Sequence, residues 1–218
     1  MTCPSRRQVL TLGLLAALAL PASAEPLDDL IKAAEMDDGR TVSTLLNQGL
    51  NPNAQDARGR TALTVAAREQ ARAALQALLT SPKLDVDRPN GNNETALMLA
   101  AIRGSLPLAQ LLVQRGASVN RPGWTPLHYA ASGPDNGVAT WLLAQGAQVD
   151  ARSENGTTPL MMAARYGNSD LVPVLLKAGA NAALKNEQGL GAADFARLGG
   201  RDRLVPELAA RAATPDAK

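Results

Sequence analysis

The sequence predicts an all-α fold, a solenoid of about six stacked helix-turn-helix units, and three observations lead to this prediction. A threonine-centred motif recurs along the chain with a nearly constant period. A leucine-rich motif follows each copy at a fixed offset, and aromatic residues make up only 2% of the 218 residues. Such a period is typical of repeats that each form one supersecondary unit, and small apolar side chains suit thin, closely stacked helices.

The threonine-centred motif reads Thr-Ala/Pro-Leu-x-x-Ala-Ala and predicts the start of a short helix. Threonine is a favoured N-cap because its side-chain oxygen accepts a hydrogen bond from the first helical turn, and proline is tolerated at the first helical position. The leucine and the alanine pair then share one face of the helix, where neighbouring helices can approach closely. The four threonines of the motif are Thr61, Thr95, Thr125 and Thr158.

The leucine-rich motif predicts a second helix in each unit. Its copies lie at the same offset from each threonine, at positions 77–79, 111–113, 141–143 and 174–176. In three units a Gly-Ala step follows, at positions 116–117, 146–147 and 179–180. Glycine readily adopts the left-handed conformation that ends many helices, so we expect the second helix to end there. One helix pair cannot bury its apolar face alone, so stability must come from stacking on neighbouring units.

The segment 125–131, Thr-Pro-Leu-His-Tyr-Ala-Ala, together with the leucine pairs and Gly-Ala steps, closely resembles the signature of the ankyrin repeat family. The resemblance covers residues 25–211 and implies an ankyrin-repeat solenoid with projecting β-hairpin or loop fingers, capped at both ends by degenerate units. The expected units are residues 25–55, 56–89, 90–122, 123–152, 153–185 and 186–211. Residues 212–218 are expected to form a flexible tail.

Residues 1–24 are predicted to be a signal peptide that is cleaved after Ala24, and the alternative is an uncleaved N-terminal anchor. Arg6 and Arg7 precede an apolar run, residues 9–20, which is too short to span a bilayer at ~20 residues. The segment 5–10, Ser-Arg-Arg-Gln-Val-Leu, also resembles a twin-arginine export signal. The choice between that route and the general secretory route stays open. We expect a periplasmic protein with no stable membrane insertion after cleavage.

Cleavage would change the charge and the chemistry of the chain. The 22 basic and 20 acidic residues become 20 of each once Arg6 and Arg7 leave. A neutral chain has no overall field that collects nucleic acid, so we expect no nucleic-acid partner. Cys3, the one cysteine, also leaves, and with it any disulfide, thiol nucleophile or thiolate ligand.

His128 is the one histidine of the chain and occupies the histidine position of the ankyrin motif. The resemblance implies a hydrogen bond from His128 to a neighbouring loop, a structural role that it shares with the four motif threonines. A zinc site needs three or four ligands, and no second histidine or retained cysteine could complete one. We therefore expect no cofactor, no metal and no catalytic residue. The alternative is an enzyme whose active site the sequence does not reveal.

Ankyrin proteins engage partners through a concave face formed by the finger tips and the exposed ends of the first helices. Carried over to this chain, the partner-binding candidates are Arg58, Arg60, Arg68, Glu94, Arg103, Arg121, Trp124, Arg165 and Tyr166. Arginine, tryptophan and tyrosine are the residues enriched in interface hot spots. Because six of the candidates are arginine, we expect a basic face and a protein partner with an acidic patch.

We therefore interpret the protein as a non-catalytic interaction scaffold and expect it to be monomeric. Its partner would be an exported enzyme that is inhibited or stabilised, or a component of stress defence. Trp124 and Tyr166 are the expected anchors of the interface. The alternative for Trp124 is that its ring folds down over the repeat.

The interval from Thr95 to Thr125 is the shortest between motif threonines, and it shortens the finger between the third and fourth units. Asn120 to Gly123 takes three steps, whereas the equivalent stretch from Asn53 to Gly59 takes six. Because fingers project from the stack, the shortening predicts a notch in their row. A neutral loop deletion and a notch that fits a partner both stay open.

Overall fold

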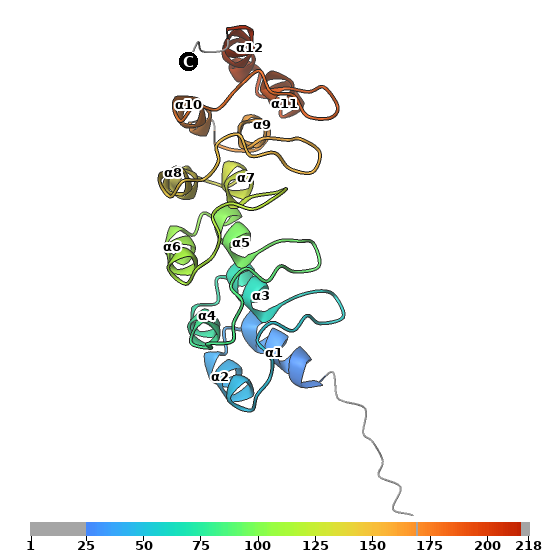
Figure 1. Ribbon diagram of the computed structural model, residues 1–218, viewed down its shortest axis with the longest axis vertical. Coiled ribbons are helices and arrows are strands. Elements are labelled where there is room, and N and C mark those ends of the chain that lie inside the picture. The colour runs from blue at the N-terminus through green and yellow to red at the C-terminus, as the bar shows by residue number, and fades with distance from the viewer. Residues whose placement is uncertain (1–24, 169, 215–218) are drawn as a thin grey trace, which may run out of the picture.

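The computed structural model describes residues 25–168 and 170–214. In this part of the chain, short helices pair into six units that stack along one axis, with two rows of helices and a row of loops projecting from one side (Figure 1). The prediction of an all-α repeat solenoid is confirmed. The predicted leader at residues 1–24 and the end of the predicted tail, residues 215–218, lie outside the described residues.

Each unit contributes one helix to each row. The first helices are α1 (Glu25–Glu35), α3 (Ala62–Glu69), α5 (Ala96–Ile102), α7 (Pro126–Ala131), α9 (Pro159–Arg165) and α11 (Ala192–Leu198). The second helices are α2 (Gly39–Asn47), α4 (Arg72–Leu79), α6 (Leu106–Gln114), α8 (Gly137–Ala144), α10 (Leu171–Lys177) and α12 (Val205–Ala213). A 3-10 turn, η1 (Asp202–Leu204), precedes α12, which continues two residues beyond the expected boundary at residue 211.

The first helices form the core of the stack. Thr61, Thr95 and Thr158 are their N-caps, and each threonine hydroxyl accepts a hydrogen bond from the backbone N–H three residues later, at 3.2 to 3.4 Å. The leucine and both alanines of every motif copy are at most 1% exposed. Small side chains on both sides of each contact let the first helices of successive units pack directly on one another, and this packing gives the solenoid one continuous core.

The second helices end as the Gly-Ala steps predict. Gly116, Gly146 and Gly179 have φ values of 94°, 84° and 91°, in the region that favours glycine. The next backbone N–H donates to the carbonyl five residues earlier, at 2.9 to 3.0 Å, which satisfies a carbonyl that the helix leaves free. The second unit lacks this step, and its helix α4 ends in overlapping turns at Thr80 and Ser81.

Four of the fingers share one turn design. A side chain five residues before the helix N-cap accepts hydrogen bonds from backbone N–H groups within the finger, as Asp56 Oδ1 does from Arg58 and Arg60 at 3.0 and 2.8 Å. Asn90 and Asn186 do the same in their fingers, and Ser153 Oγ accepts one such bond, from the Thr157 N–H. Over the described ranges the fingers contain no strand, and one isolated antiparallel bridge occurs. The fingers are therefore loops rather than β-hairpins.

The base of each finger is tied to the next unit by a second polar side chain. Asn53, Asp87, Asn120 and Asp150 each accept a backbone N–H from the turn that follows the next second helix, at 2.8 to 3.0 Å. The fourth unit keeps this contact through Asn120. Three residues after this base contact, the fourth finger has Gly123, whereas the second and third fingers have Asp56 and Asn90. The fourth finger has therefore lost its tip and kept its base.

Candidate protein-binding surface

Two of the predicted arginines on the concave face are paired within the protein. Arg60 Nε donates to Asp56 Oδ2 at 2.7 Å, and its Nη1 lies 3.8 Å from the Glu35 carboxylate. Arg68 Nε lies 3.0 Å from Glu69 Oε1. The positive charge of the N-terminal half of the face is therefore smaller than the count of arginines predicts.

Three other candidate arginines take part in none of the ion pairs found in the described residues. Arg58 at a finger tip and Arg103 at the end of α5 are exposed, and the Arg165 guanidinium lies 4.8 Å from the centre of the Tyr166 ring. Tyr166 itself is 55% exposed. A cation held on an aromatic face is a common element of binding surfaces.

Arg121 and Glu94 are held by hydrogen bonds next to the shortened finger. Arg121 donates through Nη1 and Nη2 to the backbone and side-chain oxygens of Asn93, at 2.7 and 2.8 Å. Glu94 accepts from Asn90 Nδ2 at 2.8 Å and from the Tyr129 hydroxyl at 3.2 Å. Burial and the nearby Glu94 carboxylate raise the pKa of Tyr129, so its hydroxyl stays a donor. These side chains are fixed in place before any partner arrives.

His128 links the fourth unit to the fifth. The backbone N–H of Thr125 donates to His128 Nδ1 at 3.1 Å, so Nδ1 is the acceptor, and Nε2 must carry the proton that is donated to the Thr157 carbonyl at 3.0 Å. Burial lowers the pKa of His128 below its ordinary value of 6.5, more than the Thr157 contact raises it. The neutral imidazole has both nitrogens engaged in hydrogen bonds, which leaves neither free to bind a metal.

Trp124 lies over the start of α7. Its ring meets the His128 ring edge-on, with centroids 5.2 Å apart and an interplanar angle of 68°. The ring is half-buried and leaves one side on a surface hollow of about 210 Å³. The hollow is lined by Ile102, Trp124, His128, Tyr129, Ser132 and Met162. Trp124 thus folds down over the repeat and still forms a wall of the concave face.

The hollow was not among the features predicted from the sequence. Its walls come from three successive units, with Ile102 at the end of α5, Tyr129 on α7 and Met162 on α9. The motif register carried a usable signal, because Ile102, Ser132 and Arg165 all lie seven residues after their N-cap threonine. Ser132, the small residue in the middle of this row, marks a depression between the larger side chains of Ile102 and Arg165.

Neither a metal centre nor a membrane span is found in the described chain. Over residues 25–168 and 170–214, no three or more histidine, cysteine, aspartate or glutamate side chains gather where they could hold a metal ion. Among the described helices, none is both long and apolar enough to cross a membrane.

Capped helix pairs stacked in two rows, with loops projecting over one face, define a repeat scaffold of the kind that presents a surface to other molecules. The chain belongs to the ankyrin repeat family. The family model for ankyrin repeats, which describes three copies, matches residues 30–123, 72–153, 118–186 and 135–217.

Several known proteins are similar to this chain over part or all of its length. Ankyrin repeat and SAM domain-containing protein 6 from Rattus norvegicus is 44% identical over 75 residues, which is 33% of this chain and 8% of that protein. The B-cell lymphoma 3 protein homolog from Mus musculus is 34% identical over 123 residues, or 53% of this chain and 28% of that protein. The chain therefore corresponds to only a small part of these curated relatives.

One solved structure matches over nearly its whole chain. It is the predatory endopeptidase Bd0816 from Bdellovibrio bacteriovorus in complex with the immunity protein Bd3460. A chain of this complex is 30% identical, with a TM-score of 0.69, and the match covers 84% of the present chain and 97% of that chain.

Proposed function

We propose that this protein is an exported interaction module that binds an enzyme through its concave face and holds it inactive, without catalysis of its own. The observation that supports this best is the match to 97% of a chain from a complex between an endopeptidase and an immunity protein. That complex joins a hydrolase to a protective partner, so inhibition is favoured over the two other roles, stabilisation and stress-defence adaptation.

The surface residues support a protein partner with a mixed, partly acidic contact region. Arg58, Arg103 and Arg165 offer cations that are not already paired, and Trp124 and Tyr166 offer aromatic surface. Arginine and aromatic residues dominate the energetics of protein interfaces. The acidic patch expected on the partner would lie opposite the ends of α5 and α9, where Arg103 and Arg165 are found.

Export to the periplasm is part of the proposal and is supported by residues 1–24 of the sequence alone. Arg6→Lys combined with Arg7→Lys should leave a twin-arginine substrate in the cytoplasm, because that route reads the arginine pair. Fractionation of cells that express the double variant would measure this. Continued export would indicate the general secretory route, and equal cytoplasmic retention of the unaltered protein would contradict export.

The binding proposal is tested by co-purification of the tagged protein from periplasmic extract, followed by assay of the purified partner's enzymatic activity. Addition of the protein should inhibit the partner with one-to-one stoichiometry. Arg103→Glu and Trp124→Ala should each weaken inhibition at least about tenfold, as expected for hot-spot residues.

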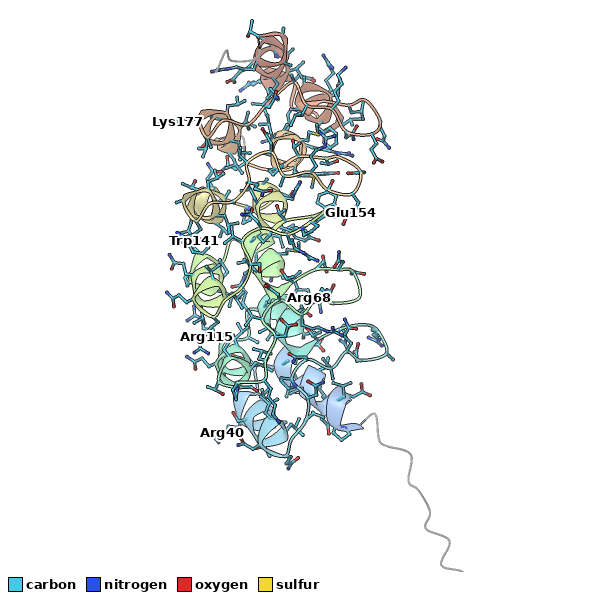
Figure 2. The ribbon with its side chains drawn as sticks, in the orientation of Figure 1. Arg40, Arg68, Arg115, Trp141, Glu154 and Lys177 are labelled. Carbon is cyan, nitrogen blue, oxygen red and sulfur yellow. The ribbon has the colours of Figure 1, made fainter. Side chains whose placement is uncertain are left out.

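Matched controls lie on the opposite side of the stack. Lys177 and Trp141 belong to the second-helix row, away from the fingers (Figure 2). Lys177→Glu repeats the charge reversal and Trp141→Ala repeats the loss of an indole ring, so both should leave inhibition unchanged. If the concave-face and control variants behave alike, the concave face is not the binding surface. An activity of the purified protein without any partner would favour the enzyme alternative.

A further inference from the structure

We infer that the hollow at the fourth unit is an anchor site for one aromatic side chain on a protruding loop of the partner protein, with a basic residue beside it. This inference rests on the proposed function, because it assigns the chemistry of the contact at the centre of the same face. It is carried by the shape of the fourth unit, the lining of the hollow, its volume and the charges at its edge.

The fourth unit is recessed at both of its exposed ends. Its finger is three residues shorter than its neighbours, and its first helix is followed by Ser132-Gly133, where the flanking units have Ile102-Arg103 and Arg165-Tyr166 at the corresponding positions. A Cβ atom on Gly133 would lie 3.2 Å from the Ala101 carbonyl oxygen, so the packing of α7 on α5 keeps this position small. A loop deletion alone would shorten the finger and leave the helix end unchanged. The two reductions together make a depression at the middle of the face.

The lining of the hollow is apolar and carries no net charge. Trp124 and Tyr129 present aromatic rings, and Ile102 and Met162 present aliphatic and thioether surface. The neutral His128 ring packs edge-on against Trp124 and is itself fully buried. Aromatic pairs in offset or edge-on contact gain stability beyond the burial of their area. Sulfur near a ring edge adds a further attraction. An incoming aromatic ring can make both kinds of contact here, which an aliphatic side chain cannot.

The volume of the hollow identifies the class of occupant. At about 210 Å³ it is smaller than the ~300–1,000 Å³ of sites that enclose small-molecule ligands. It also stays open to the surface between the shortened finger and the ends of the first helices. A single side chain fits such a site when the rest of the ligand is a protein that rests on the surrounding face.

The charges at the edge of the hollow specify the residue next to the anchor. On the finger side, the Glu154 carboxylate packs against Gly123, and the Glu94 carboxylate accepts from the Tyr129 hydroxyl that lines the hollow. Figure 2 shows Glu154 on the finger row, beside the shortened finger. Glu154 takes part in none of the ion pairs found in the described part of the chain. A lysine or arginine beside the aromatic residue would pair with it.

The first arm of the test selects peptides without needing the natural partner. A phage-displayed library of disulfide-closed heptapeptides is selected on the purified protein. We expect enrichment of Trp, Phe or Tyr at one position, with Lys or Arg adjacent to it. The protein is labelled with ¹³C at its isoleucine methyl groups for NMR, because the chain has two isoleucines. Peptide binding should shift the Ile102 signal, and the signal of Ile31, buried in α1, should stay in place.

The second arm fills the hollow from within. Ser132→Trp places an aromatic ring where the partner's ring would lie, and it should weaken peptide binding at least tenfold. Thr140→Trp adds the same ring at an exposed position of α8, in the second-helix row, and should leave binding unchanged. Should Ser132→Trp fail to fold, Trp124→Ala removes a wall of the hollow and should weaken binding to a similar degree.

Selected peptides without a common aromatic residue, or peptides that bind Ser132→Trp as tightly as the unaltered protein, would overturn the anchor site. An unchanged Ile102 signal on peptide binding would overturn it as well. These outcomes differ from a failure of the proposed function. In that case the anchor peptides still bind in the hollow, yet no enzyme is recovered from periplasm or inhibited. Conversely, an enzyme that is inhibited equally by the unaltered protein and by Ser132→Trp supports the function and rejects the anchor.

Discussion

The fourth and fifth units begin their first helices with the same motif but connect to their neighbours differently. The fifth finger makes a direct backbone contact with the sixth, in which the Glu187 N–H donates to the Asn155 carbonyl at 3.0 Å. The second and third fingers make a similar backbone contact, in which the Gly91 N–H donates to the Gly59 carbonyl at 2.7 Å. The shortened fourth finger instead uses the long side chain of Arg121, which reaches back to the third.

This difference shows which part of a finger the stack needs. The base contacts made by Asn120 and Asp150 are alike, at 2.9 Å in both units. Only the tip is missing from the fourth unit, and side chains replace its contacts. Stacking therefore depends on the finger base and the first helix, while the tip can be shortened to reshape the surface.

The largest expected effect concerns the glycine that follows the first helix of the fourth unit and of the fifth, where it sets how closely neighbouring units approach. A methyl group on Gly167 would overlap the Ala131 carbonyl oxygen, whereas on Gly133 it would lie 3.1 and 3.2 Å from two carbonyl oxygens. Overpacking costs typically about 1–3 kcal/mol, so Gly167→Ala should lose about 3 and Gly133→Ala about 1 kcal/mol of unfolding free energy. Urea denaturation of both variants measures the difference. Equal losses would mean that the two junctions are equally tight.

The next effect tests the side-chain link that is specific to the fourth unit. His128→Leu replaces the buried imidazole with an apolar side chain and leaves the Thr157 carbonyl without its buried donor. An unsatisfied buried group costs about 1–3 kcal/mol, so we expect a loss of about 2 kcal/mol. Met161 holds the same position in the fifth unit, and its sulfur lies 3.4 Å from the N-cap N–H. Met161→Leu should cost less than about 1.5 kcal/mol, as volume-conserving swaps do. Thermal and urea denaturation of His128→Leu and Met161→Leu provide the test. A smaller loss of unfolding free energy for His128→Leu than for Met161→Leu would mean that the histidine link does not set the fourth unit apart.

A smaller effect follows from the protonation of His128. Its pKa is lower in the folded protein than its ordinary value of 6.5, so between these two values the unfolded chain binds a proton that the folded protein does not. Stability then rises with pH. The contribution of neutral His128 to the free energy of unfolding should be fully present above about pH 7.5. It should decrease as the pH falls through 6.5 towards the pKa of the folded protein. Hydrogen bonds from Thr41 lower the pKa of Asp38 below 3.8. Burial raises the pKa of Asp56, but hydrogen bonds from Arg60 and Arg58 and the Arg60 charge together outweigh it and lower that pKa as well. Both carboxylates therefore lose their contribution to stability only as the pH falls below 3.8.

Urea denaturation between pH 5 and 7.5 therefore isolates the histidine. His128→Leu should abolish the slope of stability against pH in this range, since the chain has no other histidine. A slope that survives the substitution would assign the titration to another group.

The fold was predictable because its signals are local. Thr61 caps a helix through an oxygen that reaches only three residues ahead, and Gly116 ends one through its own φ angle. Both are properties of a few adjacent residues, and both recur with the period. The finger design was less predictable, since the same residue types are compatible with a β-hairpin or with the turns that Asp56 and Asn90 form.

The sequence predicted which positions lie on the binding face, but not the charge or depth of that face. Both depend on contacts between side chains of neighbouring units. Arg60 was expected to offer a free cation, but stacking of the first two units brings Glu35 to it from an earlier part of the sequence. The hollow likewise needs Ile102, Tyr129 and Met162 from three units at once. A motif register shows that these residues share a row, but not how deep the row is at its centre.

The smallest expected effect concerns the contact that replaces the missing finger tip. Arg121→Ala removes two hydrogen bonds to Asn93. Because Arg121 is only half-buried, we expect a loss of about 1 kcal/mol. Arg58→Ala is the matched control, since Arg58 is an exposed finger arginine without an ion pair in the described chain and its removal should change stability by less than about 0.5 kcal/mol. Hydrogen exchange at the finger amides, measured with urea denaturation, locates the effect. Faster exchange confined to the third and fourth fingers would show that a side chain has taken over the finger-to-finger contact, whereas unchanged exchange would mean that the shortened finger stands without support from the third.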